Sequence, residues 1–191
     1  MIFYWFCKVL AWLPLMILFP TLQKKKYKHI KGRCIYVCNH RSNLDMVIVA
    51  NRNWRFRPYV LAKQELFKNK LIGAVLKSYG GVPVDREKVD LSTIKKCIKI
   101  LNSDKKLFLF PEGTRNDELS EVKNGAVMFA IKTKSPIVPV YIKKKPKLFC
   151  LNKVIYGIPF YLDEFYGKKL DKETLEQASD LMENKIIELS N

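Results

Sequence analysis

Short apolar runs rich in strand-forming residues alternate with longer runs of helical periodicity from residue 34 to the end of the chain. This alternation is typical of an α/β fold, in which the apolar strands lie side by side and helices cover their faces. A chain of 191 residues is long enough for one such domain with a sizeable core, and no long linker divides it. We therefore expect a single domain with a central mixed, largely parallel sheet flanked by helices.

The expected elements are placed by their residue patterns. Strands are expected at 34–38, 58–62, 82–84, 106–110 and 137–142, with one or two more between 153 and 161. Helices are expected at 66–79, from about 87 to 101, at 125–132 and at 171–189. Another helix is expected to begin after the first strand, where the apolar run 44–49 follows Ser42 or Asn43 as the N-cap.

The segment Asn39-His40-Arg41-Ser42-Asn43-Leu44-Asp45 places a histidine close to a carboxylate at the turn between the first strand and the next helix. Five residues of an ideal helix turn through about 500°, so the two side chains meet only if His40 lies in the entry loop and Asp45 in the first helical turn. A carboxylate bound to one imidazole nitrogen fixes the tautomer and leaves the other nitrogen to accept a proton from a hydroxyl. We therefore predict that His40 is a catalytic base and Asp45 its orienting partner.

The same residues allow a second interpretation. Ser42 and Asp45 fit the S-x-x-[DE] capping box, in which the carboxylate merely satisfies a backbone N–H at the start of the helix. A second stretch, Phe110-Pro111-Glu112-Gly113-Thr114-Arg115, favours catalysis. Together the two stretches resemble the glycerolipid acyltransferase family of the 1-acylglycerol-3-phosphate acyltransferase type. That family has a His, four residues and an Asp, followed by a Pro-Glu-Gly-Thr-Arg loop.

The resemblance covers roughly residues 28 to 160 and includes three further blocks. These are Ala62-Lys63-Gln64-Glu65-Leu66, Gly81-Val82-Pro83-Val84-Asp85-Arg86 and Pro136-Ile137-Val138-Pro139-Val140. The chain departs from the family pattern at Pro83, where a larger apolar residue is more usual, and at Asn116, where Ser is common.

The resemblance implies transfer of a fatty acyl group from an acyl thioester to the sn-2 hydroxyl of 1-acylglycerol 3-phosphate (lysophosphatidic acid), which gives phosphatidic acid. The thioester of acyl carrier protein or coenzyme A would be a co-substrate, and neither a cofactor nor a metal is expected. His40 would act as the general base, and direct attack is the simpler mechanism because no G-x-S-x-G elbow is present to form an acyl-enzyme. Glycerol 3-phosphate or another lysolipid stays open as the acceptor.

Substrate binding is assigned by the resemblance to six residues: Lys63, Arg86, Glu112, Gly113, Thr114 and Arg115. Arg115 and Arg86 offer planar donors that hold a phosphate through two hydrogen bonds each, and Lys63 adds a point charge. Taken alone, each of these three charges also fits a solvated surface residue. Glu112 would bind acceptor hydroxyls or position Arg115. Gly113 either brings a backbone N–H to the thioester oxygen or is needed only for the turn.

Residues 1–22 are almost wholly apolar or aromatic, and six basic residues follow within 24–33. About 20 apolar residues cross a hydrocarbon core, so this length is borderline, and Lys8 and Pro14 favour a broken, partly inserted helix. We expect residues 1–23 to form an N-terminal hydrophobic membrane-anchoring helix and 24–191 the acyltransferase domain; a core helix is the alternative. The basic cluster indicates a membrane-associated protein on the cytoplasmic face.

The formal net charge of +17 implies attraction to anions, which include nucleic acid, anionic lipid and acidic carrier proteins. The chain has no recognised nucleic-acid motif, so we expect membrane lipids as partners and no nucleic acid. A non-catalytic basic protein that binds membranes or nucleic acid is the alternative class. Five cysteines, an odd count, fit a reducing compartment, and Cys34 and Cys38 are expected to be core residues rather than metal ligands.

Overall fold

The structure is a computed structural model that describes residues 16–26, 30–42, 45, 48–49, 58–84, 91–110 and 118–190, together with 6, 10 and 14. Its strands are β1 (Thr21–Lys25), β2 (Cys34–Cys38), β3 (Tyr59–Lys63), β4 (Gly81–Val84), β5 (Lys106–Leu109), β6 (Ile137–Ile142) and β7 (Asn152–Tyr156). Its helices are η1 (Gln64–Phe67), α3 (Lys70–Ser78), α4 (Leu91–Asn102), α5 (Glu118–Thr133), η2 (Asp163–Phe165) and α6 (Lys172–Ile187).

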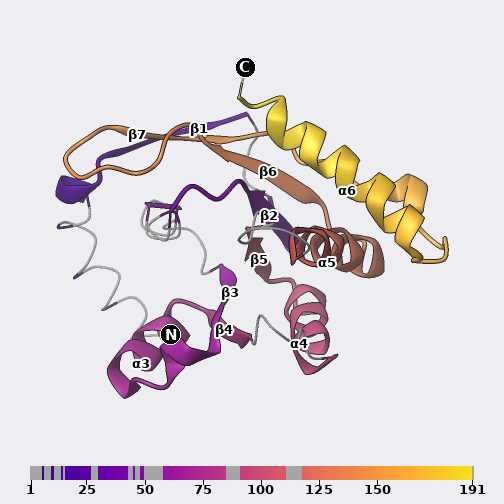
Figure 1. Ribbon diagram of the computed structural model, residues 1–191, viewed down its shortest axis with the longest axis horizontal. Helices are drawn as coiled ribbons and strands as arrows, with labels where there is room; N and C mark the ends of the chain where they lie inside the picture. Colours follow the sequence, from indigo (N-terminus) through magenta and orange to yellow (C-terminus); the bar gives the residue numbers. More distant parts are fainter. Residues whose placement is uncertain are drawn as a thin grey trace.

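In this part of the chain seven strands form one sheet, in the order β1-β7-β6-β2-β5-β3-β4 (Figure 1). The five strands from β6 to β4 run parallel to one another. β7 runs antiparallel to β6, and β1 runs parallel to β7 at the edge. The expected mixed, largely parallel sheet is therefore confirmed.

Both faces of the central strands are buried. Ile35 and Val37 of β2 pack with residues of α4, α5 and α6, which Figure 1 shows on the same side of the sheet. Cys34, Tyr36 and Cys38 point to the opposite face because side chains alternate along a strand. This explains the continuous apolar runs in the sequence. It also confirms that Cys34 and Cys38 are core residues.

The helix expected at 66–79 is wrong in its first part. Residues 64–67 form the 3-10 turn η1, and α3 begins only at Lys70. Asn69 causes the break, because its Oδ1 accepts hydrogen bonds from Leu71 N at 3.0 Å and Ile72 N at 3.1 Å. Asparagine is a preferred N-cap, since its side chain satisfies N–H groups that a helix start leaves unpaired.

Other expected bounds are met to different degrees. β6 has the expected bounds, β3 starts one residue late, and α6 begins after Asp171, whose Oδ1 accepts a hydrogen bond from Thr174 N at 3.0 Å. α5 starts well before residue 125, at Glu118, in a stretch where polar residues outnumber apolar ones. Of the one or two strands expected between 153 and 161, one forms as β7, and the residues after it make a single bridge between Ile137 and Phe160.

β1 was not expected from the sequence, and it pairs with β7 from Thr21 opposite Asn152 to Lys25 opposite Tyr156. The first three residues of the strand, 21–23, were expected to belong to the membrane anchor, so that boundary is wrong. Lysines on an edge strand discourage pairing with another chain, which is a physical reason for them there. Among the described residues, no helix is both long and apolar enough to cross a membrane. Most of residues 1–15 lie outside the described part of the chain.

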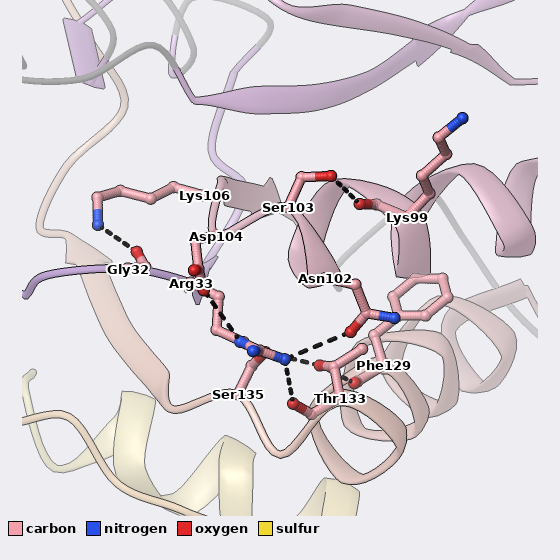
Figure 2. A network of polar contacts seen from close by, with 10 residues as sticks. All are labelled: Gly32, Arg33, Lys99, Asn102, Ser103, Asp104, Lys106, Phe129, Thr133 and Ser135. Carbon is pink, nitrogen blue, oxygen red and sulfur yellow. Dashed lines mark hydrogen bonds and ion pairs between the residues drawn. The ribbon is translucent and has the colours of Figure 1, made fainter.

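A polar network lies at the amino-terminal ends of the parallel strands β2 and β5 (Figure 2). Arg33 precedes β2 and donates hydrogen bonds to Asp104 Oδ1 at 3.3 Å, Asn102 Oδ1 at 3.3 Å and Thr133 O at 3.2 Å. Buried Lys106 donates to two carbonyl oxygens in the segment before β2. These contacts join the ends of α4 and α5 to the strands. Ligand sites in such folds form at the opposite side, beyond the carboxyl ends of the parallel strands.

Candidate active site

His40 and Asp45 meet just beyond the carboxyl end of β2. His40 lies in the loop and Asp45 in a helical conformation, and His40 Nδ1 is 2.9 Å from Asp45 Oδ2. The Asp45 side chain is 0% exposed, whereas that of His40 is 24% exposed. The predicted meeting of the two side chains is confirmed. A buried carboxylate beside an imidazole that solvent reaches is the arrangement expected of an oriented base.

Asp45 also caps the turn that carries His40. The same Oδ2 atom accepts hydrogen bonds from Arg41 N at 2.6 Å and Ser42 N at 2.7 Å, and Asp45 N donates to Ser42 O at 2.9 Å. The capping and dyad interpretations of the sequence are therefore compatible. Hydrogen bonds to a charged group contribute about 1.5–3 kcal/mol each, so these contacts offset part of the cost of burying the carboxylate.

The imidazole rests on a row of aromatic rings. The His40 ring centroid is 5.0 Å from that of Phe110, which is 5.1 Å from Phe108; Phe108 stacks on Tyr36 at 5.9 Å. The row links β2 to β5 across the face of the sheet opposite α4, α5 and α6. Phe110 was expected to end a strand and to begin the second motif, without a role of its own. Its aromatic side chain directly before Pro111 was the available signal for a site residue.

Asn39 is a second residue that the sequence analysis did not assign. Its Oδ1 accepts a hydrogen bond from Ile142 N at 2.7 Å, and its Nδ2 donates to Ile142 O at 3.1 Å. The side chain thus extends the pairing of β2 with β6 by one step beyond the last backbone pair. Asn39 is buried, and the brace fixes the backbone directly before His40.

Of the predicted substrate-binding residues, the described part of the chain includes Lys63. Lys63 ends β3 with an exposed side chain, two strands from β2 in the sheet order. Arg86, Glu112, Gly113, Thr114 and Arg115 lie outside the described residues. In sequence, Arg86 follows the end of β4 and the other four follow the end of β5, and both strands run parallel to β2.

Two buried thiols are held in their protonated form. Burial raises the pKa of the Cys34 thiol to about 11 and the pKa of the Cys97 thiol to about 12. The thiolate rather than the thiol is the nucleophile. Neither residue is therefore an activated nucleophile at neutral pH.

Comparisons with known proteins identify the family to which the chain is similar. Residues 20–143 match the model of the Acyltransferase family. The chain is 33% identical to the 1-acyl-sn-glycerol-3-phosphate acyltransferase of Bacillus subtilis over 82% of this chain and 81% of that protein. It is 30% identical to the chloroplastic 1-acyl-sn-glycerol-3-phosphate acyltransferase of Brassica napus over 60% of this chain, but spans only 34% of that longer protein.

The fold also has a solved counterpart. A crystal structure of the 1-acyl-sn-glycerophosphate (LPA) acyltransferase from Thermotoga maritima matches with a TM-score of 0.64. The match covers 95% of this chain and 76% of that one, at 20% sequence identity. At this level of identity the likeness concerns the fold.

Proposed function

This chain belongs to the Acyltransferase family, and on that premise we propose that it transfers a fatty acyl group from an acyl thioester to the free sn-2 hydroxyl of 1-acylglycerol 3-phosphate. The product is phosphatidic acid, which is used in phospholipid biosynthesis. The observation that carries the proposal is the 2.9 Å contact between His40 Nδ1 and the buried Asp45 carboxylate. Relatives named for this reaction support the choice of acceptor. The thioester of acyl carrier protein or coenzyme A is the co-substrate.

The dyad supplies the base that the acceptor needs, because a hydroxyl is a poor nucleophile until its proton is removed. Asp45 accepts the hydrogen of Nδ1 and so places the accepting lone pair of His40 on Nε2. Nε2 takes the hydroxyl proton as the acceptor oxygen attacks the thioester carbonyl. The C–S bond then breaks, and the leaving thiolate receives the proton from the imidazolium, which Asp45 stabilises meanwhile.

Direct attack is favoured over an acyl-enzyme. The sequence has no G-x-S-x-G elbow, and burial raises the pKa values of Cys34 and Cys97 well above neutrality. The buried carboxylate instead matches a role as partner of a base. The acyl group therefore moves from sulfur to the acceptor oxygen through a single tetrahedral intermediate.

The acceptor's phosphate is assigned to Arg115 and Arg86, with Lys63 adding a charge from the end of β3. The assignment of the two arginines rests on the family pattern. Because the acceptor is a lipid, we also place the protein at the cytoplasmic face of the membrane, attached through the apolar residues 1–20 that precede β1. The lysines within 24–31 support that placement, whereas Arg33 is held by Asp104, Asn102 and Thr133 at the opposite end of the strands.

Substitution of Arg115 by lysine tests the acceptor assignment. Lysine gives up the planar fork that fixes the phosphate, and with it the acceptor hydroxyl near His40. One charge-assisted hydrogen bond contributes about 1.5–3 kcal/mol, so kcat/KM for 1-acylglycerol 3-phosphate should fall roughly 10-fold to 100-fold. A matched acceptor without the phosphate should be poor with the original enzyme and lose little more. Rates with both acceptors and both thioester types form the measurement.

The matched control is Arg33→Lys, because Arg33 belongs to the network at the opposite edge of the sheet (Figure 2). This variant should keep the preference for the phosphate-bearing acceptor. Equal losses on both acceptors in Arg115→Lys would remove Arg115 from the phosphate site. A higher rate with glycerol 3-phosphate or another lysolipid would replace the proposed acceptor.

A further inference from the structure

The β6–β7 loop, residues 143–151, has a surface that the proposed reaction does not use. Four of its side chains are exposed lysines: Lys143, Lys144, Lys145 and Lys147. Three bulky apolar side chains follow, and Leu148, Phe149 and Leu151 are 54%, 70% and 60% exposed. The sequence has no acidic residue from 122 to 162. Clustered apolar side chains on a surface mark an interaction site, and lysines beside them indicate an anionic partner.

The loop is held in a defined conformation. Phe149 has a φ of 55°, in the left-handed region that bulky residues rarely adopt. Its N–H donates a 2.7 Å hydrogen bond to Leu18 O, and its ring stays exposed. Buried Asn152 accepts a hydrogen bond from Lys147 N at 3.2 Å and donates to Cys150 O at 2.9 Å. The fold thus keeps Phe149 outward at the cost of local strain, and strain of this kind gathers at functional surfaces.

The loop follows the carboxyl end of β6, and His40 follows the carboxyl end of the neighbouring parallel strand β2. Ile142, the last residue of β6, is the residue whose N–H and C=O bind the Asn39 side chain, directly before His40. The bond from Phe149 to Leu18 joins the loop to the end of the apolar N-terminal segment, and Figure 1 shows the orange loop beside that indigo segment.

We propose that the β6–β7 loop docks on an anionic lipid bilayer. Leu148, Phe149 and Leu151 enter the headgroup region, and the four lysines bind lipid phosphates. Docking of the loop would turn the carboxyl ends of the parallel strands, where His40 lies, toward the membrane that holds a lipid acceptor. Only that last step rests on the proposed function. An acidic protein would also be drawn to the lysines, but the exposed bulky apolar side chains favour a bilayer.

The test measures contact between the loop and lipid through a fluorescent label on the loop. Cys150 is exposed, whereas Cys34, Cys38 and Cys97 are buried. A polarity-sensitive fluorophore attached to Cys150 in the full-length Cys7→Ser chain should be quenched by vesicles of phosphatidylglycerol with brominated acyl chains. Brominated phosphatidylcholine vesicles should quench it weakly. The control carries the fluorophore on Ser103→Cys in a Cys150→Ser background, at the opposite edge of the sheet, and should stay unquenched.

Two pairs of variants divide the charge from the apolar contact. Lys143, Lys144, Lys145 and Lys147 are replaced with glutamine in the first variant. A single lysine near an anionic surface contributes about fivefold in binding, so the quenching amplitude should fall at least about fivefold. The same change at exposed Lys95, Lys96, Lys99 and Lys132 on α4 and α5 should leave it unchanged. Phe149→Asn keeps a residue that tolerates the left-handed conformation and should also reduce the amplitude, unlike Ile187→Asn on α6.

Each outcome decides the proposal. Absent quenching at Cys150 on anionic vesicles overturns it, as does equal loss in the lysine set on α4 and α5. A fluorophore that responds to acyl carrier protein and not to lipid would assign the loop to that protein instead. Quenching without any acyl transfer would reject the proposed function and keep the docking surface. Acyl transfer without quenching would do the reverse.

Discussion

Replacing His40 with alanine should lower kcat for acyl transfer about 100-fold to 10,000-fold, the range expected when a general base is removed. The substitution leaves Asp45 with its two backbone donors, Arg41 N and Ser42 N, so the turn keeps its cap. His40 is partly exposed, and its loss should cost little stability. Initial rates of the purified protein with a lysolipid phosphate and a thioester provide the measurement.

The chain supplies its own control, because it has only two histidines. His29→Ala should turn over at nearly the original rate. Thermal unfolding of both variants establishes that the loss in His40→Ala is not a loss of folding. A rate for His40→Ala within a few-fold of the original would rule out this residue as the base.

Asp45→Asn should reduce kcat by roughly 10⁴-fold, by analogy with the carboxylate-to-amide change in a Ser-His-Asp triad. The amide oxygen can still accept from the two backbone N–H groups, but the charge that stabilises the imidazolium is gone. Among the described residues Asp45 Oδ1 has no hydrogen-bond partner, so the amide nitrogen placed there is a buried donor without an acceptor. That defect should cost about 1–3 kcal/mol of stability.

Asp171→Asn is the matched control for this second variant. Asp171 is also a capping carboxylate, and it accepts a hydrogen bond from Thr174 N at 3.0 Å, far from His40 in the fold. Its replacement should leave kcat unchanged. If both variants retain full activity, the contact between Asp45 and His40 contributes only to the turn. If Asp45→Asn loses activity only in proportion to the fraction unfolded, the carboxylate has a structural role alone.

The pattern of apolar runs predicted the central strands because both of their faces are buried, and β6 lies at its expected bounds. β1 was missed for the opposite reason. Four of the five residues in its sequence, TLQKK, are polar, and its pairing partner β7 is distant in the chain. Local pattern carries no information on such a pairing. Asn69 shows a different limit of prediction from sequence. The run from 66 to 79 is compatible with one helix, but the Asn69 side chain favours the N-cap of a helix over its interior, and so α3 begins after it.

The site divides in the same way. The contact between His40 and Asp45 was predictable because both residues lie in one turn, where spacing determines reach. The roles of Asn39 and Phe110 were not, because their partners lie on other strands. Once the sheet order is known, both contacts follow from the neighbours of β2, which are β6 on one side and β5 on the other.

The most direct test of the central claim is the release of thiol from a fatty acyl thioester by excess purified protein, recorded before and after the acceptor is added. Direct attack through His40 predicts almost no release until 1-acylglycerol 3-phosphate is present. Release should then match the phosphatidic acid formed, identified by its mass, and both should disappear in His40→Ala. A burst of thiol equimolar with the protein before the acceptor is added, with the acyl group covalently bound to the chain, would contradict the account.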